Sequence, residues 1–128
     1  MSEVGTCGYV DPKLIALGLE SFSLSAEQIR QLDEQGYTVF ENVIDAEWLE
    51  GLRKTFDAVY EAEGEEAGVE VAQMEGVRRL ADLVNKGEVF DQVYLKPWLL
   101  AVVQHVLQRP FKLHSVNGHD PLQGHGLQ

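Results

Sequence analysis

The stretch LSAEQIRQLDEQGYTVFENVI, residues 24–44, decides how this sequence is expected to fold. Ser25 and Gln28 form a capping-box pattern, in which each side chain accepts a hydrogen bond from a free backbone N–H at a helix start. The pattern predicts a helix over Ala26–Gln35. Gly36 follows as a typical residue to end that helix, because glycine adopts the left-handed conformation found there.

A strand and two further helices are expected next. The segment Tyr37–Ile44 is rich in β-branched and aromatic residues, which favour a strand. Asp45 is a typical N-cap, and the residues after it form one apolar face at helical spacing: Trp48, Leu49, Leu52, Phe56, Val59 and Tyr60. Pro97 opens another apolar helix, which ends before Pro110. We expect these two helices to pack together with Val39, because their apolar faces are the largest in the chain.

The remaining segments have weaker patterns. Glu61–Glu70 holds five glutamates and is expected to be a solvated loop. Gly76–Val84 fits either a strand or a helix, whereas Glu88–Tyr94 has the apolar spacing of a helix. Phe111–Asn117 alternates as a strand does, and it leads into a predicted turn over Asn117–Pro121.

Composition and charge exclude several classes of protein. Ten basic residues against 21 acidic ones give a net charge of −11, so phosphate backbones and anionic lipids would be repelled. Neither a nucleic acid nor a membrane is therefore an expected partner. The single cysteine, Cys7, cannot form an intrachain disulfide, and the first residues lack the basic and apolar regions of a signal peptide. We expect a soluble, cytoplasmic protein.

Three histidines lie near the C-terminus: His114, His119 and His125, with Asp120 beside the second. A metal site needs three or four such ligands that converge. Neighbouring residues of an extended segment point to opposite faces, so His119 and Asp120 are not expected to share a metal ion. We expect exposed imidazoles here instead. No nucleophile–base set or phosphate-binding glycine motif stands out, so the residues by themselves predict no catalytic group.

The order of the elements resembles the phytanoyl-CoA dioxygenase family of Fe(II)/2-oxoglutarate oxygenases. The resemblance rests on residues 24–44 with the helix that bears Trp48, and on the closing run PFKLHSVNGHDPLQGHGLQ, residues 110–128. That family has a strand, an asparagine and a Pro/Gly-rich loop in this run, followed by an H-x-D metal motif. The resemblance implies an α+β fold with helices packed on the first strands of an incomplete double-stranded β-helix (jelly roll). Residues 24–128 would form this domain after an irregular leader over 1–23.

The same resemblance implies cofactors and site residues. The family binds Fe(II) through H-x-D and a distant histidine, which leaves positions open for 2-oxoglutarate and oxygen. Asn117 and Gln128 correspond to positions near the metal and the co-substrate, and the H-x-D is expected just after Gln128. No metal ligand is therefore assigned within this chain, and neither Fe(II) nor 2-oxoglutarate is expected to bind it tightly. The implied protein is the N-terminal portion of an oxygenase with a small-molecule substrate, inactive by itself.

An incomplete jelly roll would leave the strand Phe111–Asn117 without partners. We therefore expect a homo-oligomer that forms through this unpaired strand or through an apolar helix face. The alternative function is a non-catalytic α+β interaction module or an oxygenase remnant. The DNA after the Gln128 codon distinguishes the two, because an H-x-D within a few codons supports the oxygenase and a stop codon supports the module.

Overall fold

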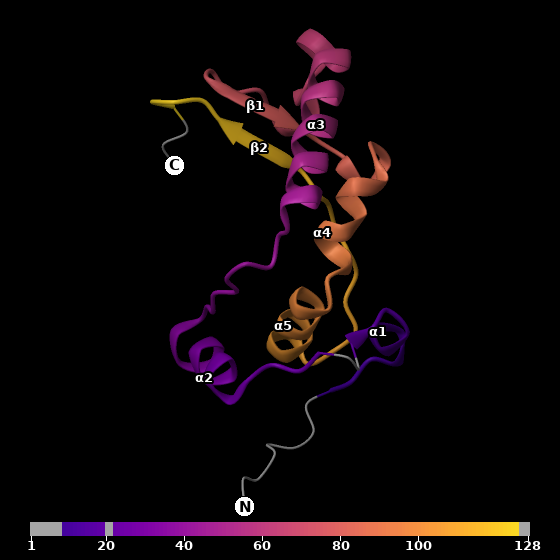
Figure 1. Ribbon diagram of the computed structural model, residues 1–128, viewed down its shortest axis with the longest axis vertical. Helices are drawn as coiled ribbons and strands as arrows, with labels where there is room; N and C mark the ends of the chain where they lie inside the picture. The colour runs from indigo at the N-terminus through magenta and orange to yellow at the C-terminus, as the bar shows by residue number, and fades with distance from the viewer. Residues whose placement is uncertain (1–8, 20–21, 126–128) are drawn as a thin grey trace, which may run out of the picture. The chain divides into compact units, whose positions relative to one another are not determined.

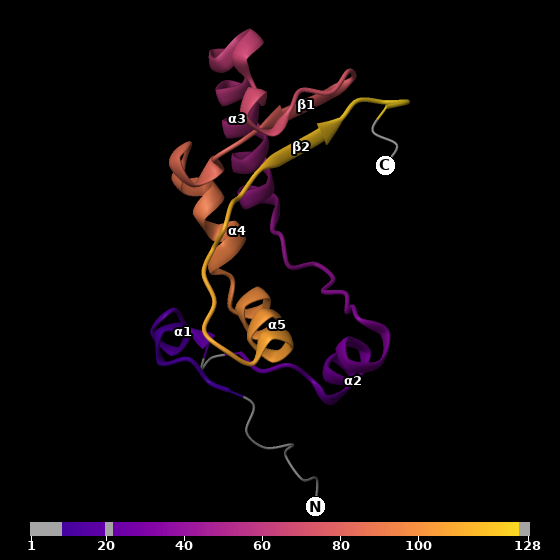
Figure 2. The ribbon, with the colours of Figure 1, turned by 180° about the vertical axis from the view of Figure 1, so that it is seen from behind.

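The computed structural model describes residues 9–19 and 22–125, and the chain divides into two units. The first unit joins Met1–Val43 to Tyr94–Leu113, and the second joins Ile44–Val93 to His114–Gln128. Each unit therefore combines two stretches that are far apart in the sequence. Figures 1 and 2 show the helices and strands of both units from opposite sides.

Three α-helices of the first unit are α1 (Pro12–Ala16), α2 (Ala26–Gln35) and α5 (Pro97–Leu107). The capping box predicted for α2 is confirmed. The Gln28 backbone N–H donates to Ser25 Oγ at 3.1 Å, and the Ser25 backbone N–H donates to Gln28 Oε1 at 2.8 Å. Gly36 ends α2 with a φ of 81°, a left-handed conformation that glycine adopts without a side-chain clash.

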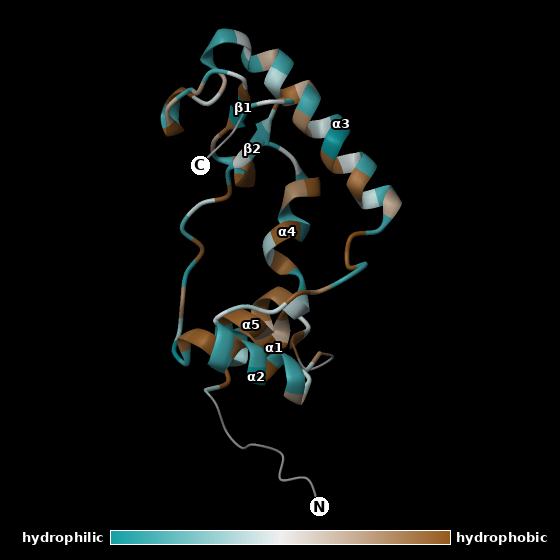
Figure 3. Ribbon diagram, turned by 90° about the vertical axis from the view of Figure 1, so that its left-hand side faces the viewer, coloured by the Kyte–Doolittle hydropathy of each residue, from teal (hydrophilic) through white to brown (hydrophobic). Residues whose placement is uncertain are grey.

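A hydrophobic cluster holds the first unit together. Its buried residues are Leu14, Leu19, Leu100 and Ala101, and the partly buried residues packed against them are Phe22, Leu24 and Phe111. Figure 3 shows that α5, which supplies two of the buried residues, is hydrophobic along most of its length. No helix within the described ranges, α5 included, has both the length and the apolar character needed to cross a membrane.

The strand predicted over Tyr37–Ile44 is wrong, because these residues form neither a strand nor a helix. Val39 is 66% exposed and does not join the core as expected. The segment is held instead by Phe40, whose ring centre lies 6.1 Å from that of Phe22 and 5.2 Å from that of Trp98. A strand needs a neighbour to accept its hydrogen bonds, and the described residues contain only one sheet, which lies in the second unit.

The second unit contains α3 (Ala46–Glu63), the helix predicted after Asp45. The Asp45 carboxylate accepts from the Trp48 backbone N–H at 2.8 Å, and the Trp48 indole N–H donates to the Val89 carbonyl at 3.1 Å. Four 3₁₀ turns and a short helix follow: η2 (Gly64–Glu66), η3 (Val69–Val71), η4 (Leu83–Asn85), η5 (Glu88–Phe90) and α4 (Asp91–Leu95). The helical prediction for Glu88–Tyr94 is confirmed by η5 and α4.

The sheet of the second unit pairs β1 (Val77–Leu80) with β2 (Gly118–Pro121) in antiparallel register. The choice left open for Gly76–Val84 is thus decided in favour of a strand for four of its residues. Helices together with this sheet confirm the α+β class. The jelly roll is not confirmed, since the only sheet among the described residues has two strands.

β2 lies later in the chain than the sequence indicated. The strand predicted over Phe111–Asn117 is wrong, and the strand forms in the segment predicted as a turn. Asp120 of β2 lies directly opposite Arg78 of β1, and opposite charges across a sheet favour pairing. The register is therefore set by a partner that lies 42 residues away.

The helix α3 packs on a second hydrophobic cluster, whose buried residues are Ala67, Leu80, Leu83 and Phe90. Partly buried residues of α3 packed against it are Leu52, Phe56, Val59 and Tyr60. The prediction of a common core for this helix and α5 is wrong, because their apolar faces belong to different clusters. The apolar side chains of β1 and the 3₁₀ turns cover α3 instead. The loop expected over Glu61–Glu70 is only partly solvated, since Ala67 within it is 5% exposed.

We predict that Leu80→Ala lowers the free energy of unfolding by about 2–5 kcal/mol, the usual cost of emptying a fully buried leucine site. Leu80 is 0% exposed, whereas Leu122, the matched control, is 50% exposed. Leu122→Ala should change stability by no more than about 0.5 kcal/mol. Urea denaturation followed by circular dichroism measures both, and equal losses would contradict this assignment of the core.

Candidate functional site

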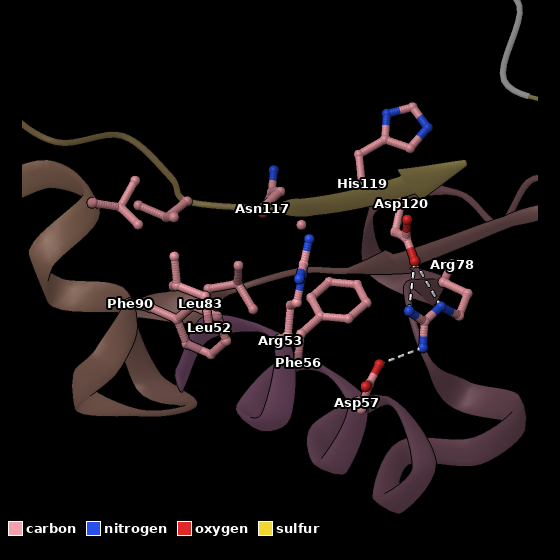
Figure 4. Close-up of a pocket in the computed structure, with 13 residues that line it drawn as sticks. Leu52, Arg53, Phe56, Asp57, Arg78, Leu83, Phe90, Asn117, His119 and Asp120 are labelled. Atoms are coloured by element: carbon pink, nitrogen blue, oxygen red, sulfur yellow. Dashed lines mark hydrogen bonds and ion pairs between the residues drawn. The ribbon is translucent and has the colours of Figure 1, made fainter. Parts of the chain in front are cut away.

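A pocket of about 450 Å³ lies in the second unit, between α3 and the chain segment that enters β2. Its apolar lining is formed by Leu52, Phe56, Leu83, Phe90, Val93 and Val116. Its polar lining is formed by Arg53, Asp57, Arg78, Asn117, His119 and Asp120. Small-molecule sites have this character, with mostly apolar walls and a few polar groups that fix orientation. Figure 4 shows these side chains.

Arg78 of β1 forms the best-connected polar group of the pocket. Its Nε and Nη2 atoms donate to Asp120 Oδ2 at 2.9 and 2.5 Å, and its Nη1 donates to Asp57 Oδ1 at 2.7 Å. The guanidinium carbon also lies 5.2 Å from the ring centre of Phe56 and 5.5 Å from that of Tyr60, within the range of cation–π attraction. Arg78 thus ties β1 to β2 and to α3.

The charge of Arg78 is fixed by these partners. Hydrogen bonds from its guanidinium to Asp57, and next to Asp120, raise the pKa of Arg78 above its ordinary value. Arginine is already protonated throughout the working range of proteins, so the shift keeps it a permanent cation. Because both carboxylates are engaged, we assign Arg78 a structural role in holding the pocket together.

The backbone before β2 is held close to the rest of the pocket. The Leu83 backbone N–H donates to the Val116 carbonyl at 2.9 Å, and the Asp82 backbone N–H donates to Asn117 Oδ1 at 3.3 Å. A Cβ atom on Gly118 would lie 2.4 Å from Phe56 Cε2, so only glycine permits this approach of the chain to α3. Asn117 is therefore held at the pocket by its neighbours on both sides.

The residues singled out from the sequence do not meet at one point. Asn117 lines the pocket, whereas Gln128 and Cys7 lie outside the described residues. Figure 4 shows His119 and Asp120 on opposite sides of β2, as expected for neighbours in a strand. His114 is exposed, with its Nδ1 3.2 Å from Ser115 Oγ.

His125, the last of the three C-terminal histidines, lies away from the pocket lining. The ring of His125 lies against Gly76, where an added Cβ would be 2.1 Å from His125 Cγ. Among residues 9–19 and 22–125, no three or more His, Cys, Asp or Glu side chains are grouped so that they could hold a metal ion. The described donor set does not fit an iron centre, because Asp120 is bound to Arg78 and the histidines do not converge on it.

The sequence analysis missed Asp57, Arg78 and Arg53, and no motif marks them. Asp57 and Arg78 meet through tertiary structure across 21 residues of chain. The only local signal is the spacing of Phe56 and Tyr60, which places the two rings on one face of α3. That spacing indicates a core face equally well, so it could not identify a cation-binding surface.

We predict that Arg78→Gln lowers the free energy of unfolding by about 1–2 kcal/mol, because partly exposed ion pairs and cation–π contacts each contribute up to about 1 kcal/mol. Asp120→Asn should cost more than Asp57→Asn. Asp120 accepts two of the hydrogen bonds, and its side chain is 44% exposed against 60% for Asp57. Urea denaturation measures the series with Arg109→Gln, an exposed arginine, as the control. A loss no larger than that of the control would refute the role given to Arg78.

Comparison with known proteins identifies the family. No curated protein and no solved structure matches the chain at a significant level. Residues 32–123 match the phytanoyl-CoA dioxygenase (PhyH) family. The matched region contains α3, β1, β2 and all the residues that line the pocket. It covers well over half of the 128 residues, so this chain belongs to the phytanoyl-CoA dioxygenase family.

Proposed function

We propose that the chain is the N-terminal portion of an Fe(II)/2-oxoglutarate-dependent oxygenase that acts on a small molecule. The observation that carries the proposal is the family match over residues 32–123, which includes a pocket bordered by Asn117. The family resemblance relates Asn117 to a position near the co-substrate. Gln128, at the end of residues 110–128, would likewise lie near the metal and the co-substrate. We further propose that the protein is cytoplasmic.

In this proposal the described residues supply a binding wall and not the metal centre. The apolar lining and the few polar groups of the pocket suit a small organic substrate. Iron would be held by residues other than those described, because the described carboxylates and histidines do not converge. When bound, iron with 2-oxoglutarate would supply the oxidising chemistry, and this part of the chain would bind and orient the substrate.

We predict that the purified chain shows no stoichiometric binding of Mn(II), the redox-inert substitute for Fe(II), with or without 2-oxoglutarate. A tight site needs three or four converging ligands. Anaerobic titration calorimetry measures this directly. One tight site that is lost in His119→Ala or His125→Ala would place a metal centre on the C-terminal histidines and contradict the proposal.

The oxygenase function is tested by sequencing the DNA after the Gln128 codon and by assaying the protein produced from the longer reading frame. We expect an H-x-D within a few codons, and we expect protein produced from the longer frame to convert 2-oxoglutarate to succinate in the presence of Fe(II). Changing the new histidine to alanine is the matched control and should abolish succinate formation. A stop codon at this place, with no turnover, would support the non-catalytic interaction module instead.

We propose in addition that the chain forms a homo-oligomer through an apolar helix face, the exposed end of α5. Val106 and Leu107 at the end of α5 are 60% and 40% exposed, and Leu113 shortly after the helix is 50% exposed, so they offer apolar surface to a second copy. Size exclusion with light scattering should show a species heavier than 14.3 kDa whose share rises with concentration. A mass of 14.3 kDa at every concentration would refute this interface.

A further inference from the structure

Arg53 lines the pocket and has no hydrogen-bonding or charged partner among residues 9–19 and 22–125. Figure 4 shows its side chain extending from α3, beside Phe56, toward the segment that holds Asn117. Within the described part of the chain, no hydrogen bond or ion pair joins the Arg53 guanidinium to another residue. This cation is therefore available to a ligand in the pocket.

The helix α3 offers Arg53 two acidic neighbours, and both are engaged elsewhere. Glu50, three residues earlier, pairs with Lys54 at 3.6 Å, and Asp57, four residues later, accepts from Arg78 at 2.7 Å. Positions three and four residues away are where a helical arginine normally finds its partner. Both acidic neighbours of Arg53 on the helix are thus engaged, which leaves its charge at the pocket without a described partner in a chain with 21 acidic and 10 basic residues.

The surroundings of Arg53 define what the pocket would accept. Leu52, Phe56 and Val116 line the pocket and are only partly buried, so their apolar side chains are accessible to a ligand that reaches the guanidinium. Arginine binds a carboxylate through two parallel N–H···O bonds. An apolar surface next to a single arginine is thus complementary to a molecule with an apolar body and one carboxylate.

The other charges of the pocket limit the ligand to one negative charge. The guanidinium of Arg78 donates three of its five N–H groups to Asp57 and Asp120, and these two carboxylates neutralise its charge. The same two carboxylates would repel a second negative charge placed nearby. A phosphate dianion is therefore a poorer fit than a monocarboxylate.

We propose that this pocket binds a small monocarboxylate with an apolar body, with Arg53 as the carboxylate anchor and Leu52, Phe56 and Val116 against the body. Naming this ligand as the substrate rests on the proposed oxygenase function. The binding itself does not, because it needs neither iron nor 2-oxoglutarate. In this proposal Arg53 selects among substrates, and Arg78 keeps the pocket formed.

The test uses 4-phenylbutyrate as the probe, without metal or 2-oxoglutarate, and titration calorimetry or protein-observed NMR as the readout. We expect saturable binding with a Kd on the order of 1 mM, the affinity reached by a probe of this size. The neutral amide of the same acid should bind about tenfold more weakly, because it loses the charge-assisted hydrogen bonds. Inorganic phosphate should bind more weakly still.

Two variants decide whether Arg53 is the anchor. Arg53→Gln should weaken 4-phenylbutyrate about tenfold and leave the amide unchanged, because only the acid uses the guanidinium. Lys54→Gln is the matched control, since it removes the same charge one residue away from a side chain that is 76% exposed and does not line the pocket. Urea denaturation should show both variants to be as stable as the parent chain, because neither side chain is buried.

Several results would overturn the proposal: no saturable binding of the acid, equal binding of the acid and the amide, stronger binding of phosphate, or equal losses in the two variants. These results are separable from those for the oxygenase. Succinate formation by the longer protein without binding of the acid would refute the ligand class alone. Binding of the acid without succinate formation would refute the oxygenase alone.

Discussion

The guanidinium of Arg78 joins three elements of the second unit, and the pocket depends on this junction. It binds Asp120 across the sheet, Asp57 on α3, and the faces of two aromatic rings on the same helix. A two-stranded sheet is marginal by itself, so packing against a helix is needed for it to persist. Arg78 contributes the polar contacts between β1 and α3. Leu80, two residues later on the same strand, is fully buried and contributes the apolar contacts.

The two hydrophobic clusters give the chain two separate cores in place of one. Each is small, with four buried members, so each leaves much of its helical surface only partly covered. In the second unit the incomplete cover produces the pocket, because α3 presents Arg53 and Phe56 to the segment before β2 and no further side chain fills the space between them. A small core thus leaves room for a ligand, whereas a fully packed one would not.

Family membership and the local chemistry of the pocket give different kinds of information about this chain. The match over residues 32–123 makes the chain a dioxygenase-type domain, yet the described acids and histidines are engaged in structure or do not converge. Arg53 is the exception to this pattern, since its helical neighbours are already paired. An arginine that has no partner among the described residues and lies beside an apolar surface has the chemistry of a carboxylate-binding wall.

The sequence by itself determined the features that depend on residues close together in the chain. The capping box of Ser25 and Gln28, the helix after Asp45 and the helix opened by Pro97 could all be predicted, because helix hydrogen bonds and caps join residues only three or four positions apart. The family was also recognisable from residues 24–44 and 110–128, and Asn117, singled out in the second run, lines the pocket of the second unit.

Only the tertiary structure decided the sheet, the cores and the polar centre of the pocket. Tyr37–Ile44 has strand-forming residues but finds no partner strand in the part of the chain that the structure describes, whereas Gly118–Pro121 has poor strand formers and pairs with β1. Arg78 and Asp120 are 42 residues apart, and no local pattern marks either one. Strand pairing and ion pairs between distant residues depend on how the chain returns on itself, and that information is not contained in the spacing of neighbouring residues.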